Sequence, residues 1–228
     1  MQRLLYLFVA LFVSALSSAQ AFLPTDPIGT VLQYEVTKKD TVEHYYFVLK
    51  GIEKRSDSIW MEIEQKNKLK EKGVIMKLLY KPTSLSMDIG RFMIDAIEMG
   101  KDAASEISAS VSGESLSIPL QYSSEKLPLE TSKISMKVSR IVTVSIQMGW
   151  KEKKIVGWET LDLPSGKYET FLVRGRVHIS AGVSILKKNI NINYIFWIAP
   201  RIGVVKYQRE VSDEKNTYYL SQKTLPQR

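Results

Sequence analysis

The chain has 228 residues and a formal net charge of +8, with 44% hydrophobic and 25% charged residues. It contains no cysteine and two histidines, His44 and His178, which excludes disulfides and cysteine-based zinc sites and leaves little scope for a histidine metal cage. No nucleic-acid-binding motif accompanies the positive charge, so we expect no nucleic-acid partner, and we predict no cofactor.

The first 21 residues have the order of a secretory signal peptide. Arg3 supplies a positive charge, Leu4 to Leu16 form an apolar run, and Ala19-Gln20-Ala21 provides small residues for cleavage before Phe22. The run is shorter than the roughly 20 residues of a membrane span. We therefore predict an exported protein of the periplasm or cell envelope, in which residues 22–228 form a single β-rich domain without a membrane span. An uncleaved N-terminal anchor is the alternative.

Most of the remaining chain alternates apolar and polar residues, which is typical of antiparallel strands with one buried face. The alternation is clearest over residues 32–37, 59–64, 171–179 and 190–198. Turn-forming residues separate such runs at 39–40, 56–57, 164–166, 200–203 and 212–216. We predict a mainly β fold, either a single antiparallel, curved sheet or a partly open β-barrel.

The middle of the chain departs from this alternation. Phe92, Ala96 and Met99 would share one face of a helix, so we predict a minor helical element near 91–104. Residues 105–117 are rich in Ser, Ala and Gly and are predicted to form a loop or a weak strand.

A long apolar face runs from Ile134 to Ile146, with Arg140 in its middle. It exceeds the common strand length of about 5–6 residues, so we predict one bent strand with a bulge near Ser139 and Arg140 that carries the arginine to solvent. The alternative keeps Arg140 inside, paired with a carboxylate or facing a polar cavity. Arg140 is therefore a candidate ligand-binding residue.

Three side chains of the strand predicted at 171–179 form a second candidate site. Arg174, Arg176 and His178 project from one face and span about 13 Å at the usual strand rise. Because arginine makes paired charge-assisted hydrogen bonds, this row is a candidate site for an acidic head group or a glycan carboxylate. The alternative is an ordinary solvated sheet face.

Four aromatic residues lie on strong strand signals and are predicted to be largely buried or half-buried. They are Tyr194, Phe196, Trp197 and Trp158. Truncation of a buried aromatic side chain costs about 3–5 kcal/mol, so these residues are predicted to anchor the core.

Four segments together resemble a known family. They are residues 85–89, 113–119, 158–170 and 196–206, the last containing Trp197-Ile198-Ala199-Pro200-Arg201-Ile202-Gly203. In this order they resemble a TapB-like family of uncharacterised exported bacterial proteins, related to a domain-of-unknown-function family. The resemblance covers residues 28–222 and implies a β-rich envelope protein; it carries over no catalytic residue.

No phosphate-binding loop, metalloprotease motif or complete nucleophile elbow is present, so we predict that the protein is not an enzyme. A strongly curved sheet can hold a ligand on its concave face, which favours a binding or carrier module for an apolar or anionic ligand. The alternative is a structural or assembly factor that acts through protein contacts, and a hydrolase of unrecognised type is a third hypothesis. The expected partners are a lipid, an anionic head group or an envelope protein.

Overall fold

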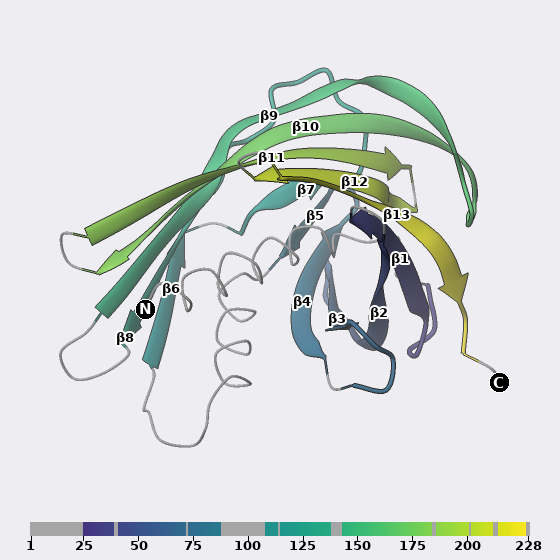
Figure 1. Cartoon of the computed structure of the whole chain (residues 1–228), viewed down its shortest axis with the longest axis horizontal. Coiled ribbons are helices and arrows are strands. Elements are labelled where there is room, and N and C mark those ends of the chain that lie inside the picture. Colours follow the sequence, from purple (N-terminus) through teal and green to yellow (C-terminus); the bar gives the residue numbers. More distant parts are fainter. Residues whose placement is uncertain are drawn as a thin grey trace.

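The computed structural model describes residues 25–38, 41–71, 73–87, 108–113, 115–137, 143–183, 186–200, 202–211 and 214–226. In this part of the chain, β-strands form one antiparallel sheet that is not closed (Figure 1). The predicted mainly β, antiparallel and curved fold is confirmed. The predicted signal peptide, the helical element near 91–104 and Arg140 lie outside the described residues.

The sheet contains thirteen strands, counted over the described residues. In chain order they are β1 (Val31–Lys38), β2 (Thr41–Lys54), β3 (Ile59–Lys66), β4 (Val74–Lys81), β5 (Ser84–Met87), β6 (Ser108–Gly113), β7 (Ser117–Pro119), β8 (Thr131–Lys137), β9 (Thr143–Leu163), β10 (Gly166–Val183), β11 (Leu186–Ala199), β12 (Gly203–Val211) and β13 (Glu214–Thr224). Their order in the sheet is β6-β8-β9-β10-β11-β12-β13-β1-β2-β3-β4-β5-β7, so β6 and β7 are its two ends.

The sheet bends into an open arch, with β9 to β13 across its top and β1 to β5 on one side (Figure 1). One apolar cluster is assembled from the inward-facing residues of strands all around the arch. The alternation predicted this face correctly: Leu32, Tyr34 and Val36 are fully buried, as are Phe171 and Val173. The core therefore lies on the concave side of the sheet.

Two of the turns predicted from the sequence contain a glycine with positive φ. Gly166 and Gly203 both have positive φ, +135° and +107°, which favours glycine over residues with a Cβ atom. They are the first residues of β10 and β12, at two of the predicted turns.

The prediction of one bent strand from Ile134 to Ile146 is wrong. This region contains two strands, β8 and β9, which pair so that Ile134 lies opposite Ile146. The apolar residues of both strands have even numbers. The alternation therefore continues from one strand into the next, and the sequence pattern resembles that of one long strand. Residues 105–117, predicted as a loop or weak strand, include β6 and the start of β7.

The burial of the predicted aromatic anchors is confirmed for three residues and wrong for Trp158. Tyr194 and Phe196 are fully buried and Trp197 is 7% exposed, whereas Trp158 is 56% exposed. Trp158 pairs with Phe171, but β8 pairs with β9 only as far as Gly149. Trp158 therefore lies on the free rim of the sheet, where its ring stacks on Tyr122 at 5.6 Å.

Candidate functional site

Aromatic rings line much of the concave side. Phe196 of β11, Tyr207 of β12 and Tyr218 of β13 are consecutive cross-strand neighbours, and the rings of Tyr207 and Tyr218 stack with centroids 4.3 Å apart. Tyr34 of β1 meets Tyr207 at 6.2 Å and Phe47 of β2 at 5.5 Å. These residues form an aromatic stripe that crosses five strands.

A row of polar residues crosses the same concave side next to the aromatic stripe. The register places Lys153, Gly175, Tyr194, Arg209 and Asn216 opposite one another across β9 to β13. We call the four residues with polar side chains, Lys153, Tyr194, Arg209 and Asn216, the polar belt. Lys153, Tyr194 and Asn216 are buried and Arg209 is half-buried, so the belt is enclosed by apolar neighbours.

Lys153 enters a buried ion pair that links strands near opposite ends of the sheet. Its Nζ donates to Glu130 Oε2 at 2.8 Å and to the Ser117 carbonyl oxygen at 3.1 Å, and Ser117 Oγ donates to Glu130. The Lys153 and Glu130 side chains are only 1% and 9% exposed. Burial lowers the pKa of Lys153, while the bond to Glu130 opposes this shift. The cluster joins β9 to β7 across the arch.

Gly175 lets a large ring cross the belt. A Cβ atom added at Gly175 would lie 2.5 Å from Trp150 Cζ3 and 3.0 Å from the Glu152 carbonyl oxygen. The Trp150 ring meets that of Tyr194 at 6.3 Å, and Lys153 Nζ lies 5.4 Å from the Trp150 ring centroid. The absent side chain thus allows Trp150 to pack between β9 and β11.

Three buried polar atoms in this region have no hydrogen-bond partner among the described residues: Trp150 Nε1, Tyr194 Oη and Arg209 Nε. Burial raises the pKa of Tyr194, although nearby Arg209 opposes the shift, so its hydroxyl remains a neutral donor. No carboxylate of the described residues lies within 4.0 Å of the Arg209 guanidinium. Such atoms are costly to bury unpaired, at about 1–3 kcal/mol each. The three donors therefore suit a ligand group that carries acceptor oxygen atoms.

None of these three donors was predicted from the sequence as a site residue. Arg209 shares its parity with the apolar residues Tyr207 and Val211, which was a signal that it faces inward. A carboxylate or phosphate is the natural partner of such a guanidinium. No group of three His, Asp or Glu residues in the described ranges could hold a metal ion. No helix within those ranges is long and apolar enough to cross a membrane.

The predicted row Arg174, Arg176 and His178 lies on the outer face of β10, opposite in direction to Gly175. Arg176 Nε donates to Asn193 Oδ1 at 3.0 Å, and His178 Nδ1 lies 2.9 Å from Asn191 Oδ1. Neither arginine forms an ion pair with another described residue, although the register places Glu152 beside Arg176. The structure thus keeps the three predicted residues together but separates them from the polar belt.

The fold and its inner face define an open, single-sheet antiparallel β-protein with polar groups set in an aromatic interior. A family model described as DUF3108-like matches residues 29–225, and the chain belongs to this family. The expected relation to a family of unknown function is confirmed, whereas no comparison carries the TapB name. No curated protein matches the chain.

Two solved structures share the fold. One is a protein from Parabacteroides distasonis ATCC 8503 described as a lipoprotein, with 15% sequence identity and a TM-score of 0.59. The other is a protein from Bacteroides fragilis NCTC 9343 described as exported and with a YmcC-like fold, with 14% identity and a TM-score of 0.55. Both alignments cover 90% of this chain and 99% of the other, so the likeness extends over most of the chain.

Proposed function

We propose that this protein is a non-enzymatic carrier or binding module of the cell envelope that holds an amphipathic ligand on its concave side. The acidic head group of the ligand would bind the polar belt, and its apolar part would lie along the aromatic stripe. The observation that carries this proposal is the set of three unpartnered buried donors, Trp150 Nε1, Tyr194 Oη and Arg209 Nε.

Charge supports an acidic head group. The other cation of the belt, Lys153, is buried and already neutralised by Glu130, whereas half-buried Arg209 has no carboxylate partner among the described residues. A guanidinium and two neutral donors can together bind the oxygen atoms of one carboxylate or phosphate. An apolar molecule alone would leave all three donors unpaired, so we favour an amphipathic ligand over a purely apolar one.

The envelope location is supported by the predicted signal peptide and by the two structural neighbours, which are described as a lipoprotein and as an exported protein. This chain differs from a lipoprotein in that its sequence contains no cysteine, the residue that carries the lipid. A carrier needs access to its ligand, and we infer that the ligand would enter where β6 and β7, the two ends of the sheet, do not pair.

Binding of dodecanoate and of 1-dodecanol to the purified mature protein tests the proposal by isothermal titration calorimetry. The two ligands share their chain and differ in the head group. We expect Arg209→Gln to weaken dodecanoate binding about 10- to 100-fold, the loss of one charged hydrogen bond, and to leave dodecanol binding unchanged.

Arg174→Gln is the matched control, because it removes the same charge from the outer face of the sheet. Equal weakening by both substitutions would mean that the net charge, and not the belt, attracts the carboxylate. If neither ligand binds the wild-type protein, the carrier proposal is wrong and the alternative of an assembly factor gains support.

A further inference from the structure

The outer face of the sheet carries a polar surface that the proposed carrier function does not use. The register sets two transverse rows of outward-facing residues across β6, β8, β9, β10 and β11. The first row is Ser110, Ser135, Ser145, Gly182 and Lys187, and the second is Ser112, Lys133, Gln147, Ser180 and Asn189. Neither row contains a carboxylate.

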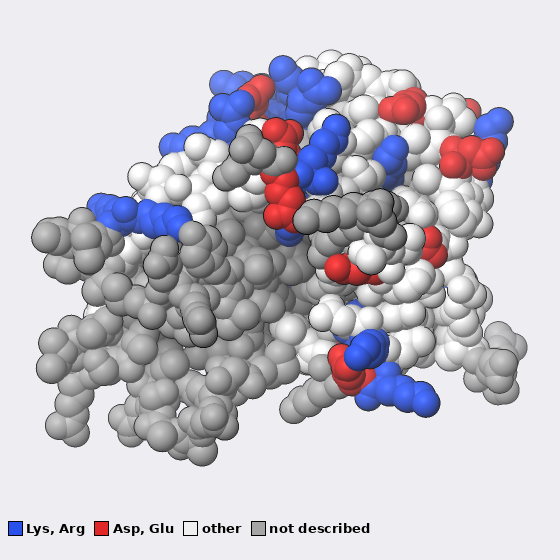
Figure 2. Space-filling model, viewed as in Figure 1, with Lys and Arg blue, Asp and Glu red and all other residues white. Residues whose placement is uncertain are grey.

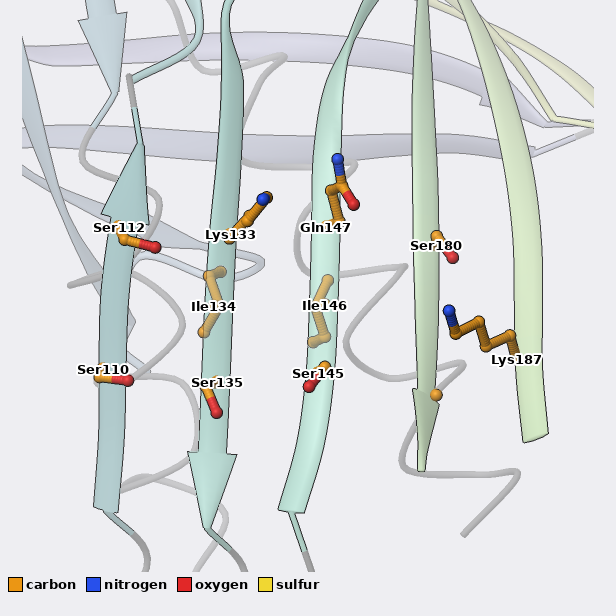
Figure 3. Close-up of a pocket in the computed structure, with 11 residues that line it drawn as sticks. Ser110, Ser112, Lys133, Ile134, Ser135, Ser145, Ile146, Gln147, Ser180 and Lys187 are labelled. Atoms are coloured by element: carbon orange, nitrogen blue, oxygen red, sulfur yellow. The ribbon is translucent and has the colours of Figure 1, made fainter. Parts of the chain in front are cut away.

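All residues of these two rows except Asn189 line a hollow of about 430 Å³, together with Ile134 and Ile146. Most of the outward-facing residues that line it are short, namely five serines and Gly182, and Gln147 and two lysines are the longer ones. Figure 3 shows Lys133 turning from β8 toward β9 and Lys187 turning from β11 toward β10. The hollow is thus lined by hydroxyl groups on four strands, and the ammonium groups of Lys133 and Lys187 both reach into it.

The row Arg174, Arg176 and His178 continues this surface along β10, since His178 is two residues from Ser180. In Figure 2, lysine and arginine side chains outnumber the acidic ones among them over the upper left of the molecule, the region of β9 and β10 in Figure 1. The positive charge of the hollow therefore belongs to a larger basic region and is not isolated.

We propose that this hollow is a docking site for an acidic glycan chain. Sugar hydroxyls would exchange hydrogen bonds with the serine and amide side chains, and glycan carboxylates would bind Lys133 and Lys187. At a strand spacing of 4.7–4.9 Å, the five strands give a polar path about 19 Å long, which suits an extended chain better than a single small anion.

The composition of the hollow disfavours a membrane surface as its partner. Peripheral membrane binding relies on apolar side chains that enter the lipid, together with basic residues. The large exposed apolar residues of the described chain lie elsewhere, at Ile28, Val42, Leu69, Tyr122, Leu129, Val156, Trp158 and Leu225. Hydroxyl groups, amides and ammonium groups without an apolar anchor match a hydrated polysaccharide instead.

Titration with tetragalacturonate, with the neutral cellotetraose as a comparison, tests the site. We expect Lys133→Glu combined with Lys187→Glu to weaken tetragalacturonate binding at least tenfold. Lys68→Glu combined with Lys81→Glu changes the net charge equally on exposed residues of β3 to β4 and is expected to alter binding less than twofold. Ser145→Leu fills the hollow without a charge change and should also weaken binding at least tenfold.

Circular dichroism establishes that each variant is folded. The proposal is overturned if Ser145→Leu binds tetragalacturonate as well as wild type, or if the control pair weakens binding as much as the Lys133 and Lys187 pair. It is also overturned if wild type prefers phosphatidylglycerol vesicles and the Lys133 and Lys187 substitutions abolish that binding, which would assign the face to a membrane. None of these results depends on the concave side.

Discussion

The buried ion pair between Lys153 and Glu130 is predicted to contribute to the stability of the fold. Lys153→Met keeps a long side chain but removes the ammonium group, leaving the Glu130 carboxylate 9% exposed with Ser117 as its hydrogen-bonding neighbour. Removing one partner of a buried pair costs about 3–5 kcal/mol, a large share of the 5–15 kcal/mol that stabilises a typical domain. We expect the melting temperature to fall by about 6–20 °C.

The double variant Lys153→Met with Glu130→Met distinguishes two causes of destabilisation, an unpaired buried charge and a lost side-chain contact. It leaves no unpaired ion, and replacing a buried pair with apolar residues is often neutral or stabilising. We therefore expect the double variant to recover most of the stability lost by Lys153→Met, measured by urea denaturation. A loss below about 1 kcal/mol in the single variant, or an equal loss in the double variant, would refute the reasoning.

Three further predictions concern single positions. Phe196→Ala should lose about 3–5 kcal/mol and rim-exposed Trp158→Ala about 1, compared by thermal melting. Burial raises the pKa of Glu64, but the Gly73 amide and two lysines lower it more, to a net value below 4.5. Glu64→Gln should therefore cost about 1–3 kcal/mol at neutral pH, a difference that shrinks in urea denaturation series below pH 4.5. Gly175→Ala should destabilise the fold, seen as a lower urea midpoint, because the added methyl collides with an indole ring.

Alternation along the chain predicted which residues of most strands face inward, since side chains of a strand point to opposite sides in turn. Alternation alone predicts the wrong face of the sheet for Lys153. Ile146, Met148 and Trp150 point inward, so continued alternation would send Lys153 outward. β9 instead has an extra residue between Trp150 and Glu152, opposite Val177 and Arg176, which reverses the parity and turns Lys153 into the core.

Of the candidate sites, one could be predicted from the sequence of a single strand and two could not. Arg174, Arg176 and His178 could be grouped from one strand alone, because they are spaced two residues apart. The polar belt takes one residue from each of four strands, and the hollow takes one or two outward-facing residues from each of five. Both sites therefore depend on neighbours and registers that no single segment encodes. Arg209 had a readable parity, but its position beside Tyr194 required the pairing of β11 with β12.

The two proposed sites lie on opposite faces of the sheet, because successive side chains of β10 point to opposite sides. Arg174 and Arg176 point to the outer face, and Gly175 between them faces the polar belt. A ligand on one side therefore cannot contact the side chains that serve the other. Because both arginine side chains point away from the belt, a substitution of either one should leave the packing of Trp150 and Tyr194 unchanged. Carrier binding and glycan docking should thus be lost independently, and a glycan-bound protein should still take up its amphipathic ligand.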